Sequence, residues 1–262
     1  MIALEHVSKS FGNQVVLDDV SLSFPMGQTT AIIGPSGTGK SVLLKHIVGL
    51  LRPDSGRVMV LGTDMATAKE DALFSVRRRL GMLFQDGALF GSMSVGENIA
   101  FPLEHHRGDL TAAERAERVD EVLEQVELPG FANREVSELS GGQRKRVGLA
   151  RAIVTRPEVV LFDEPNSGLD PLTSDSIDAL IGQMKEALGI TFIVISHDIV
   201  GTLNVADCVG MLYGGKLIAY GPTQEILKNP HPVLRRFLQR NVALPDTPNS
   251  NPHLPQALKE HS

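Results

Sequence analysis

Short apolar runs alternate with helix-like patterns along much of this 262-residue chain. Residues 30–33 form one such run, and the apolar positions within residues 42–48 have the spacing of a buried helix face. Further along, the apolar runs 159–162 and 191–196 flank a helical stretch over residues 172–188. This alternation is typical of a parallel sheet covered by helices, so the pattern predicts an α/β fold.

Two regions depart from that alternation. Residues 2–7, 15–24 and 57–60 are β-rich segments separated by glycines, and we expect them to form an antiparallel layer beside the core. Within residues 111–127, apolar side chains recur at i, i+3, i+4 and i+7 on a highly charged stretch, which predicts an amphipathic helix. We therefore expect a helical subdomain over about residues 95–155, inserted between core strands.

The composition changes near the C-terminal end of the sequence. Residues 230–262 hold six of the 15 prolines, with Asn, His and Asp between them, so a packed element is not expected beyond about residue 239. We interpret this tail as an extension that either has no fixed place or grips a partner. The apolar positions within residues 233–238 have helical spacing, and the alternative is a terminal helix that packs on its own domain. We expect one domain over residues 1–240 and a Pro-rich extension over residues 241–262.

Charge and cysteine content narrow the function classes. The formal net charge is −6 and the pI is near 5.8, which argues against nucleic acid as a partner because phosphate contacts need a strongly positive surface. The single cysteine, Cys208, excludes an internal disulfide, and its β-like surroundings predict a core thiol. No signal-peptide pattern and no run near the ~20 apolar residues of a membrane span are seen, so we expect a soluble subunit.

The segment GPSGTGKS after the first apolar run is a full match to the phosphate-loop pattern G-x-x-x-x-G-K-[ST]. In this pattern the glycines let backbone N–H groups close on phosphates, the lysine binds the β- and γ-phosphates, and the hydroxyl binds Mg²⁺. A helix beginning near Thr38 would direct its positive end at the phosphates. The complete motif in this context argues against a Gly-rich turn without a ligand. The expected ATP-binding residues are Gly34, Pro35, Ser36, Gly37, Thr38, Gly39, Lys40 and Ser41.

Two further motifs carry chemistry. Asp163 ends an apolar strand, where its carboxylate can reach Mg²⁺ held by Ser41, and Glu164 is placed to orient and deprotonate an attacking water. The alternative, an ordinary acidic pair at a strand end, is disfavoured by the apolar run before the pair and by Pro165 after it. A second anion site at a helix start is offered by the segment LSGGQ, which comprises Leu139, Ser140, Gly141, Gly142 and Gln143.

The motifs GPSGTGKS, LSGGQ, VVLFDEP and SGLD, followed by His197, resemble those of ATP-binding cassette (ABC) ATPases in kind and order, over most of residues 1–230. The resemblance implies a phosphate-loop NTPase core of parallel strands, an antiparallel β layer and an inserted helical subdomain, which together bind ATP and Mg²⁺ and hydrolyse the ATP. It also implies that two copies of the chain pair head to tail. The segment from Ser140 to Gly142 of one copy then completes the ATP site of the other.

The same resemblance assigns roles to single residues. Phe11 matches the aromatic residue that stacks on adenine, and Gln85 matches the glutamine that contacts Mg²⁺ or water and links the core to the helical subdomain. His197 matches the switch histidine that contacts the γ-phosphate, and Asp170 matches the aspartate that communicates between paired sites. Asn166 departs from the Thr common at its position, which bears only on local hydrogen bonding. The implied catalytic residues are Glu164, His197 and Gln85, and the implied metal ligands are Ser41, Gln85 and Asp163.

Residues 84–106, FQDGALFGSMSVGENIAFPLEHH, resemble the segment with which cassette ATPases grip the coupling helix of their permease. The FQ-x-GALF and PL-x-EH patterns are similar to the ATPase of Mla-type phospholipid transporters, which work with Mce-domain proteins. This implies an integral-membrane permease, an Mce-domain protein and a small accessory subunit as partners, lipid as cargo, and a peripheral place on the cytoplasmic face of the inner membrane. In that family the C-terminal extension helps the two ATPase chains hold each other, which is the hypothesis for residues 230–262.

Other interpretations stay open. An ABC ATPase for another cargo, such as amino acid import or lipoprotein release, shares every catalytic motif and differs in the coupling segment. A soluble ABC protein of translation or DNA repair is disfavoured because such proteins usually carry tandem cassettes or long coiled coils, and a phosphate-loop kinase leaves LSGGQ unexplained. His105 and His106 do not indicate a metal site, since adjacent residues rarely share a helix face, so Mg²⁺ is the only metal expected.

Overall fold

A central sheet of mainly parallel strands organises the fold. The computed structural model describes residues 1–85, 87–106 and 110–241. Within them, the strands of this sheet are β3 (Thr29–Ile33), β6 (Leu80–Leu83), β7 (Val159–Asp163), β8 (Thr191–Ile195), β9 (Cys208–Tyr213) and β10 (Lys216–Pro222). Their order is β10-β9-β3-β8-β7-β6, and only the pair of β9 and β10 is antiparallel. Every residue of β3 and β8 is buried, as is typical of parallel strands covered on both faces.

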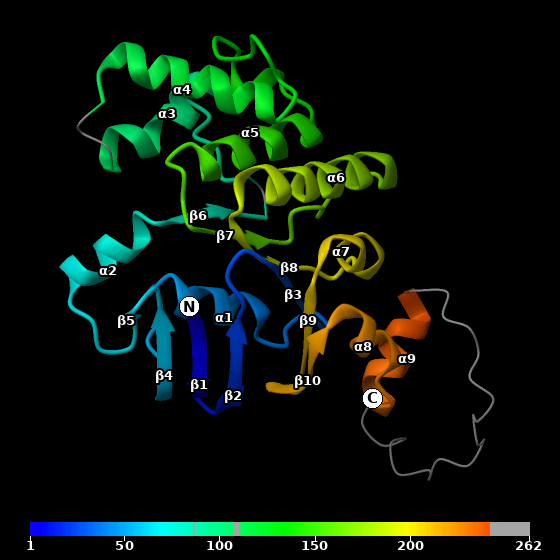
Figure 1. Cartoon of the computed structure of the whole chain (residues 1–262). Coiled ribbons are helices and arrows are strands. Elements are labelled where there is room, and N and C mark those ends of the chain that lie inside the picture. Colours follow the sequence, from blue (N-terminus) through cyan, green and yellow to red (C-terminus); the bar gives the residue numbers. More distant parts are fainter. Residues whose placement is uncertain (86, 107–109, 242–262) are drawn as a thin grey trace.

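A second, antiparallel sheet lies beside the first (Figure 1). Its strands are β1 (Ile2–Phe11), β2 (Gln14–Phe24), β4 (Ser55–Val60) and β5 (Thr63–Asp64), in the order β2-β1-β4-β5. The expected α/β fold with an antiparallel layer is therefore confirmed. The strand β1 is longer than its apolar run, because its pairing with β2 continues to the register pair Phe11 and Gln14.

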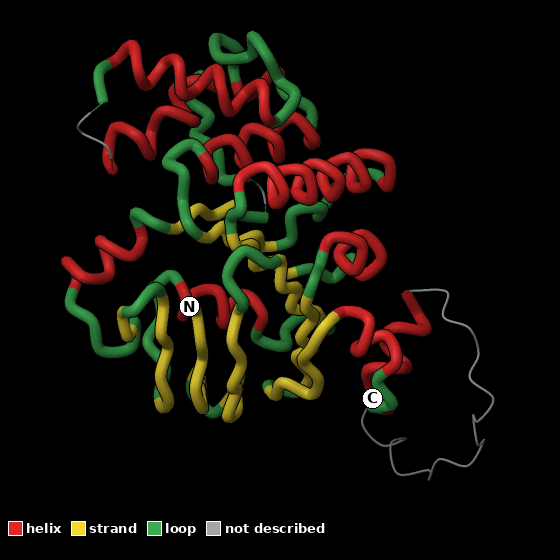
Figure 2. Tube along the Cα trace, in the orientation of Figure 1, coloured by secondary structure: helices red, strands yellow, loops and turns green. Residues whose placement is uncertain are grey.

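Helices cover the central sheet and also fill the part of the molecule farthest from the antiparallel sheet. They are α1 (Lys40–Ile47), α2 (Glu70–Arg77), α3 (Val95–His106), α4 (Ala112–Gln125), the short 3₁₀ helix η1 (Val136–Glu138), α5 (Gly141–Ile153), α6 (Pro171–Leu188), α7 (Ile199–Val205), α8 (Thr223–Lys228) and α9 (Pro232–Asn241). The region from α3 to α5, named here the helical region, contains no named strand among its described residues and lies at the top of Figures 1 and 2. In the part of the chain that the structure describes, no helix is both long and apolar enough to cross a membrane.

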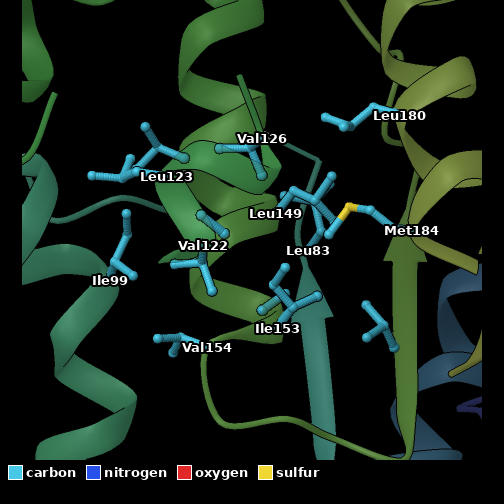
Figure 3. Close-up of a cluster of buried hydrophobic side chains, with 14 of the residues drawn as sticks. Leu83, Ile99, Val122, Leu123, Val126, Leu149, Ile153, Val154, Leu180 and Met184 are labelled. Carbon is cyan, nitrogen blue, oxygen red and sulfur yellow. The ribbon is translucent and has the colours of Figure 1, made fainter. Parts of the chain in front are cut away.

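The helical region has its own apolar core, which continues onto the central sheet. Side chains from α3, α4, α5, β6 and α6 meet there (Figure 3), among them Ile99, Val122, Leu149, Leu83 and Met184. The helix α4 begins with a reciprocal capping box, because the Thr111 side chain accepts from the Glu114 N–H and the Glu114 side chain accepts from the Thr111 N–H. The amphipathic helix predicted over residues 111–127 is therefore present as α4.

Two further apolar clusters hold the remaining elements. One joins the two sheets around α1 and includes Leu17, Leu43 and Leu212. The other joins β3 and β9 to α7, α8 and α9, and it buries Leu234 and Leu238 fully. The terminal helix α9 therefore packs on its own domain, which was the alternative interpretation of its helical spacing. Residues 242–262, which make up almost all of the predicted Pro-rich extension, lie outside the described residues.

Two local expectations are wrong. The helix α1 begins at Lys40 rather than near Thr38, because Gly39 has φ 97° and serves as the N-cap in the left-handed region. Cys208 is half-buried rather than a core thiol, because it is the first residue of β9. Its Sγ lies 3.6 Å from the side-chain oxygen of Gln28.

Candidate nucleotide site

The loop between β3 and α1 is a turn that its glycines make possible. Gly34, Gly37 and Gly39 have φ angles of 148°, 78° and 97°, a range that side-chain-bearing residues rarely adopt. A Cβ at Gly34 would also lie 2.2 Å from the carbonyl oxygen of Leu212, which only glycine avoids. Ser36 is exposed at the tip of the loop. The backbone itself therefore requires this glycine spacing.

Lys40 lies beneath the loop and ties it together. Its Nζ donates to the carbonyl oxygens of Gly34 at 2.8 Å and Pro35 at 3.0 Å, and Thr38 Oγ1 donates to the same Pro35 oxygen at 2.9 Å. Burial lowers the pKa of Lys40, and the carboxylates at positions 163 and 164 oppose that shift. An ammonium has three donors, so the third is left for a phosphate oxygen.

Ser41 and Asp163 meet where α1 begins and β7 ends. Ser41 Oγ donates to Asp163 Oδ1 at 3.0 Å. Burial raises the pKa of Asp163, the hydrogen bond from Ser41 lowers it, and the Glu164 carboxylate raises it further. A hydroxyl and a carboxylate are oxygen ligands of the kind that Mg²⁺ prefers, and a cation there would favour the charged carboxylate. The donor set therefore fits Mg²⁺.

Glu164 and His197 come from the ends of neighbouring strands. The last residue of β7 pairs with Ile195 of β8, and the Glu164 N–H donates to the Ile195 carbonyl at 2.9 Å. This register brings His197 Nδ1 within 3.0 Å of Glu164 Oε2, and since a carboxylate only accepts, Nδ1 donates. Glu164 has φ 53°, the left-handed region that is uncommon for a residue with a side chain. The fold thus holds the predicted base and the predicted switch histidine in direct contact.

The LSGGQ segment forms the start of α5. Leu139 is buried, and Ser140 is the N-cap. Ser140 Oγ accepts from the Gln143 N–H at 3.2 Å, while Gln143 Oε1 accepts from the Ser140 N–H at 3.0 Å. Ser140 and Gly141 are exposed and Gly142 is half-buried, so free N–H groups of the first turn can meet an anion. In Figure 1, α5 lies in the helical region while α1 lies beside the antiparallel sheet, so the chain does not bring this segment to its own phosphate loop.

Phe11 and Asp170 lie at the periphery of the site. Phe11 ends β1 with 47% of its surface exposed, and Lys9 Nζ lies 5.6 Å from its ring centroid. Asp170 is the N-cap of α6, where its carboxylate accepts from the Thr173 N–H at 3.0 Å and the Thr173 hydroxyl at 2.6 Å. These hydrogen bonds lower the pKa of Asp170. An exposed ring and an exposed carboxylate are both available to a ligand or a second chain.

Gln85 is held by contacts that sequence reasoning did not anticipate. Its side-chain Nε2 donates to Ser167 Oγ at 3.2 Å, so the structure places it against the loop after β7. Its carbonyl accepts from the ammonium of Lys145, which also lies 3.5 Å from the Glu164 carbonyl and is only 5% exposed. The available signal was helical spacing, because Lys145 is four residues before buried Leu149 on the same helix face. Lys145 lies between Arg144 and Arg146, and three consecutive basic residues do not by themselves show which of them is buried.

A phosphate loop, an acidic pair and a histidine at adjacent strand ends, together with a second helix-start motif, define a nucleotide-hydrolysing cassette. The sequence model of the ABC transporter family matches residues 17–167, and the chain belongs to this family. Over 238 residues it is 42% identical to the intermembrane phospholipid transport system ATP-binding protein MlaF of Escherichia coli K12, covering 91% of this chain and 88% of that protein.

Other relatives carry different names. The "Probable ribonucleotide transport ATP-binding protein mkl" of Mycobacterium leprae is 41% identical over 90% of this chain and 68% of that protein. The methionine import ATP-binding protein MetN of Geobacillus kaustophilus is 39% identical over 97% of this chain and 75% of that protein. The family is therefore shared by proteins whose names give several cargos.

Solved structures agree with the family. A dimeric post-hydrolysis state of the ATP-binding cassette MJ0796, bound to ADP and Pi, matches with a TM-score of 0.77 and 33% identity over 85% of this chain and 99% of that one. The cbiO1 structure from Clostridium perfringens, part of the ABC transporter complex cbiONQ, matches with a TM-score of 0.79 and 30% identity, covering 91% of this chain and 94% of that one. The expected cassette fold is confirmed, and the chain is an ABC-type ATPase.

Proposed function

We propose that the chain energises a transporter that moves phospholipids between bacterial membranes, from the cytoplasmic face of the inner membrane. The observation that carries the proposal is the likeness to MlaF, which spans 88% of that protein. In this proposal the partners are a second copy of the chain, an integral-membrane permease, an Mce-domain protein and a small accessory subunit. Amino acid import is the second candidate, favoured by the likeness to MetN.

ATP hydrolysis is proposed to take place between two copies. Lys40 and the loop after β3 bind the β- and γ-phosphates, and the first turn of α5 from the other copy closes on the same nucleotide. Ser41, Asp163 and Gln85 would hold Mg²⁺, which when bound neutralises phosphate charge. The dimeric state of the MJ0796 cassette supports this pairing.

Glu164 and His197 are proposed to perform the chemical step. Glu164 orients the attacking water and accepts its proton, because its carboxylate follows directly on the metal-binding strand end. His197 donates through Nδ1 to that carboxylate, which fixes the orientation of the ring, and with a second proton on Nε2 the imidazolium can also donate to the γ-phosphate. Asp170, at the start of α6, is proposed to communicate with the second copy.

An apolar groove supports the permease as a partner. It has a volume of about 450 Å³ and runs between β6 and the helices α3 and α5, lined by Met82, Phe84, Phe90, Phe101, Pro102 and Arg151. The rings of Phe90 and Phe101 lie in tilted contact, with centroids 4.9 Å apart and planes at 49°. Arg151 donates to the carbonyls of Gly87 at 2.7 Å and Ala88 at 2.8 Å, which shapes one wall. A groove with exposed aromatic side chains suits the apolar face of a partner helix.

The variant Phe90→Glu is expected to lose the membrane partner. A charge in an apolar groove must be desolvated when the partner docks, so recovery of the permease with the tagged chain should fall at least about 10-fold. The matched control is Leu50→Glu, which places the same charge at a side chain that is 59% exposed and lies outside the groove. Equal recovery with both variants, at unchanged melting temperature, would exclude the groove as the docking site.

The cargo is tested by purifying the tagged chain with its native membrane partners in mild detergent and identifying proteins and lipids by mass spectrometry. A permease recovered with an Mce-domain protein and phospholipid supports the proposed function. A permease of another class keeps the cassette and overturns the cargo. Absence of any membrane partner would instead favour a soluble ABC ATPase.

A further inference from the structure

A buried carboxyl group lies behind the nucleotide site and outside the motifs. Asp178 is on α6 with 7% of its surface exposed, and its Oδ1 accepts from Nδ2 of Asn166, which is 8% exposed, at 2.9 Å. Among the described residues, neither Asp178 Oδ2 nor Asn166 Oδ1 has a hydrogen-bond partner. Buried polar atoms are nearly always paired, so two unpaired oxygens in one contact need an explanation.

The same carboxyl group packs against α7. A Cβ at Gly201 would lie 1.9 Å from Asp178 Oδ2, so only the absence of a side chain lets the two helices approach this closely. Asn166 comes two residues after Glu164, and Gly201 comes four residues after His197. Asp178 therefore contacts both segments that carry the proposed catalytic pair, Glu164 and His197.

Other acidic groups surround this carboxyl group. Asp175 is exposed one turn earlier on α6, and Asp198 is the N-cap of α7. Burial, followed by these two carboxylates, raises the pKa of Asp178 to about 6, against the lowering effect of the Asn166 amide. A cavity of about 410 Å³ borders the cluster and is lined by Asn166, Asp198 and Gly201, so water lies within reach if the contact loosens.

We propose that Asp178 is a positioning residue for ATP hydrolysis, whose neutral carboxyl group holds the Glu164 and His197 segments together and whose ionised form loosens them. A proton on this group removes the repulsion from Asp175 and Asp198 and turns Oδ2 from an unpaired acceptor into a donor. An ionised carboxylate in the same place is poorly solvated and is relieved when α7 moves away. The proposal rests on the proposed roles of Glu164 and His197.

The test compares Asp178→Asn with the wild-type full-length chain. Asparagine keeps an acceptor for Asn166, adds a donor and cannot ionise, so it imitates the neutral acid at every pH. Asp178→Ala removes the acceptor and leaves the Asn166 amide unpaired. The matched control is Glu186→Gln, which removes one exposed carboxylate from the same helix.

Thermal stability and amide hydrogen exchange, both measured without nucleotide, test whether the neutral carboxyl group of Asp178 links the two segments. The native carboxyl keeps its proton to a higher pH than the unfolded one, so the contribution of Asp178 to wild-type stability falls as pH rises from about 4 to about 6 and is constant above. The melting temperature of Asp178→Asn should exceed that of wild type by about 3–6 °C at pH 7.5. Amides of α7 should exchange about 10-fold faster in wild type than in Asp178→Asn at pH 7.5 and equally at pH 5.

Turnover tests the positioning role. The ratio of the wild-type kcat to the Asp178→Asn kcat should fall about 3- to 10-fold as pH rises through 6, while KM for ATP stays unchanged. A ratio taken at each pH is used because titration of the nucleotide site itself affects both proteins equally. Asp178→Ala should lose kcat at every pH, and Glu186→Gln should match wild type throughout. Equal amide exchange and equal melting temperature for wild type and Asp178→Asn at pH 7.5 would show that the protonation state of Asp178 does not link the two segments, and would overturn the proposal. If exchange and melting temperature differ as expected but the kcat ratio does not change with pH, Asp178 links the two segments without positioning the groups that hydrolyse ATP.

Discussion

Replacing Glu164 by Gln is expected to lower the kcat of ATP hydrolysis by about 10²- to 10⁴-fold while ATP still binds. The amide cannot accept a proton from water, although it keeps nearly the same shape and can still contact His197, whose Nδ1 lies 3.0 Å from the native carboxylate. Binding should persist because the proposed phosphate contacts come from the β3–α1 loop, whose hydrogen bonds through Lys40 do not involve Glu164. Two copies should therefore accumulate as a closed dimer around ATP.

Single-turnover hydrolysis and light scattering with and without ATP measure the two parts of this expectation. The control is Glu124→Gln, which removes an exposed carboxylate from α4 and should hydrolyse ATP as the wild type does. Hydrolysis by Glu164→Gln at the wild-type rate would assign the base to another group. A monomer at saturating ATP would instead contradict the head-to-tail pairing.

Replacing Lys40 by Met is expected to weaken ATP binding by about 10- to 100-fold. The change keeps an unbranched side chain under the loop but removes the cation, and a hydrogen bond to a charged phosphate contributes about 1.5–3 kcal/mol. The carbonyls of Gly34 and Pro35, which accept from Nζ at 2.8 Å and 3.0 Å, also lose their shared donor. Isothermal titration with ATP and Mg²⁺ gives the change in Kd directly.

Lys228→Met is the control for this change, since it removes an exposed ammonium from α8. Its Kd for ATP should equal that of the wild type. The melting temperature of Lys40→Met is measured without nucleotide. An unchanged value means that weaker ATP binding comes from the lost charge contact, and a lower value means that the loop itself is disrupted. An unchanged Kd in a folded Lys40→Met chain would mean that the Lys40 ammonium does not bind the phosphates.

The central strands β3, β7 and β8 could be predicted from the sequence almost to the residue. The apolar runs before Gly34 and before Glu164 became β3 and β7, because strands buried on both faces need apolar side chains at every position. The start of α1 was missed by two residues, since the pattern of apolar positions does not register the left-handed backbone of Gly39. Periodicity reports which side is buried, and backbone conformation decides where a helix can begin.

The site could be predicted where it is made of contiguous motifs, and not where it is made of distant contacts. Ser41 and Asp163 were paired by the chemistry of their motifs and lie in hydrogen-bond contact. The contact of Lys145 with the Gln85 carbonyl and that of Asp178 with Asn166 and Gly201 depend on how α5, α6 and α7 pack. The only trace of such contacts in the sequence is a polar residue at a position where the helical spacing predicts a buried side chain.

The left-handed backbone of Glu164 lowers the stability of the fold at a residue whose side chain is proposed to take part in the reaction. A residue with a side chain held at φ 53° costs the folded chain about 1–3 kcal/mol, and glycine, asparagine or aspartate would bear that conformation more easily. Selection for a stable chain alone would therefore not retain glutamate at this position. In a lineage that had ceased to hydrolyse ATP, this is a position where drift toward glycine would raise stability.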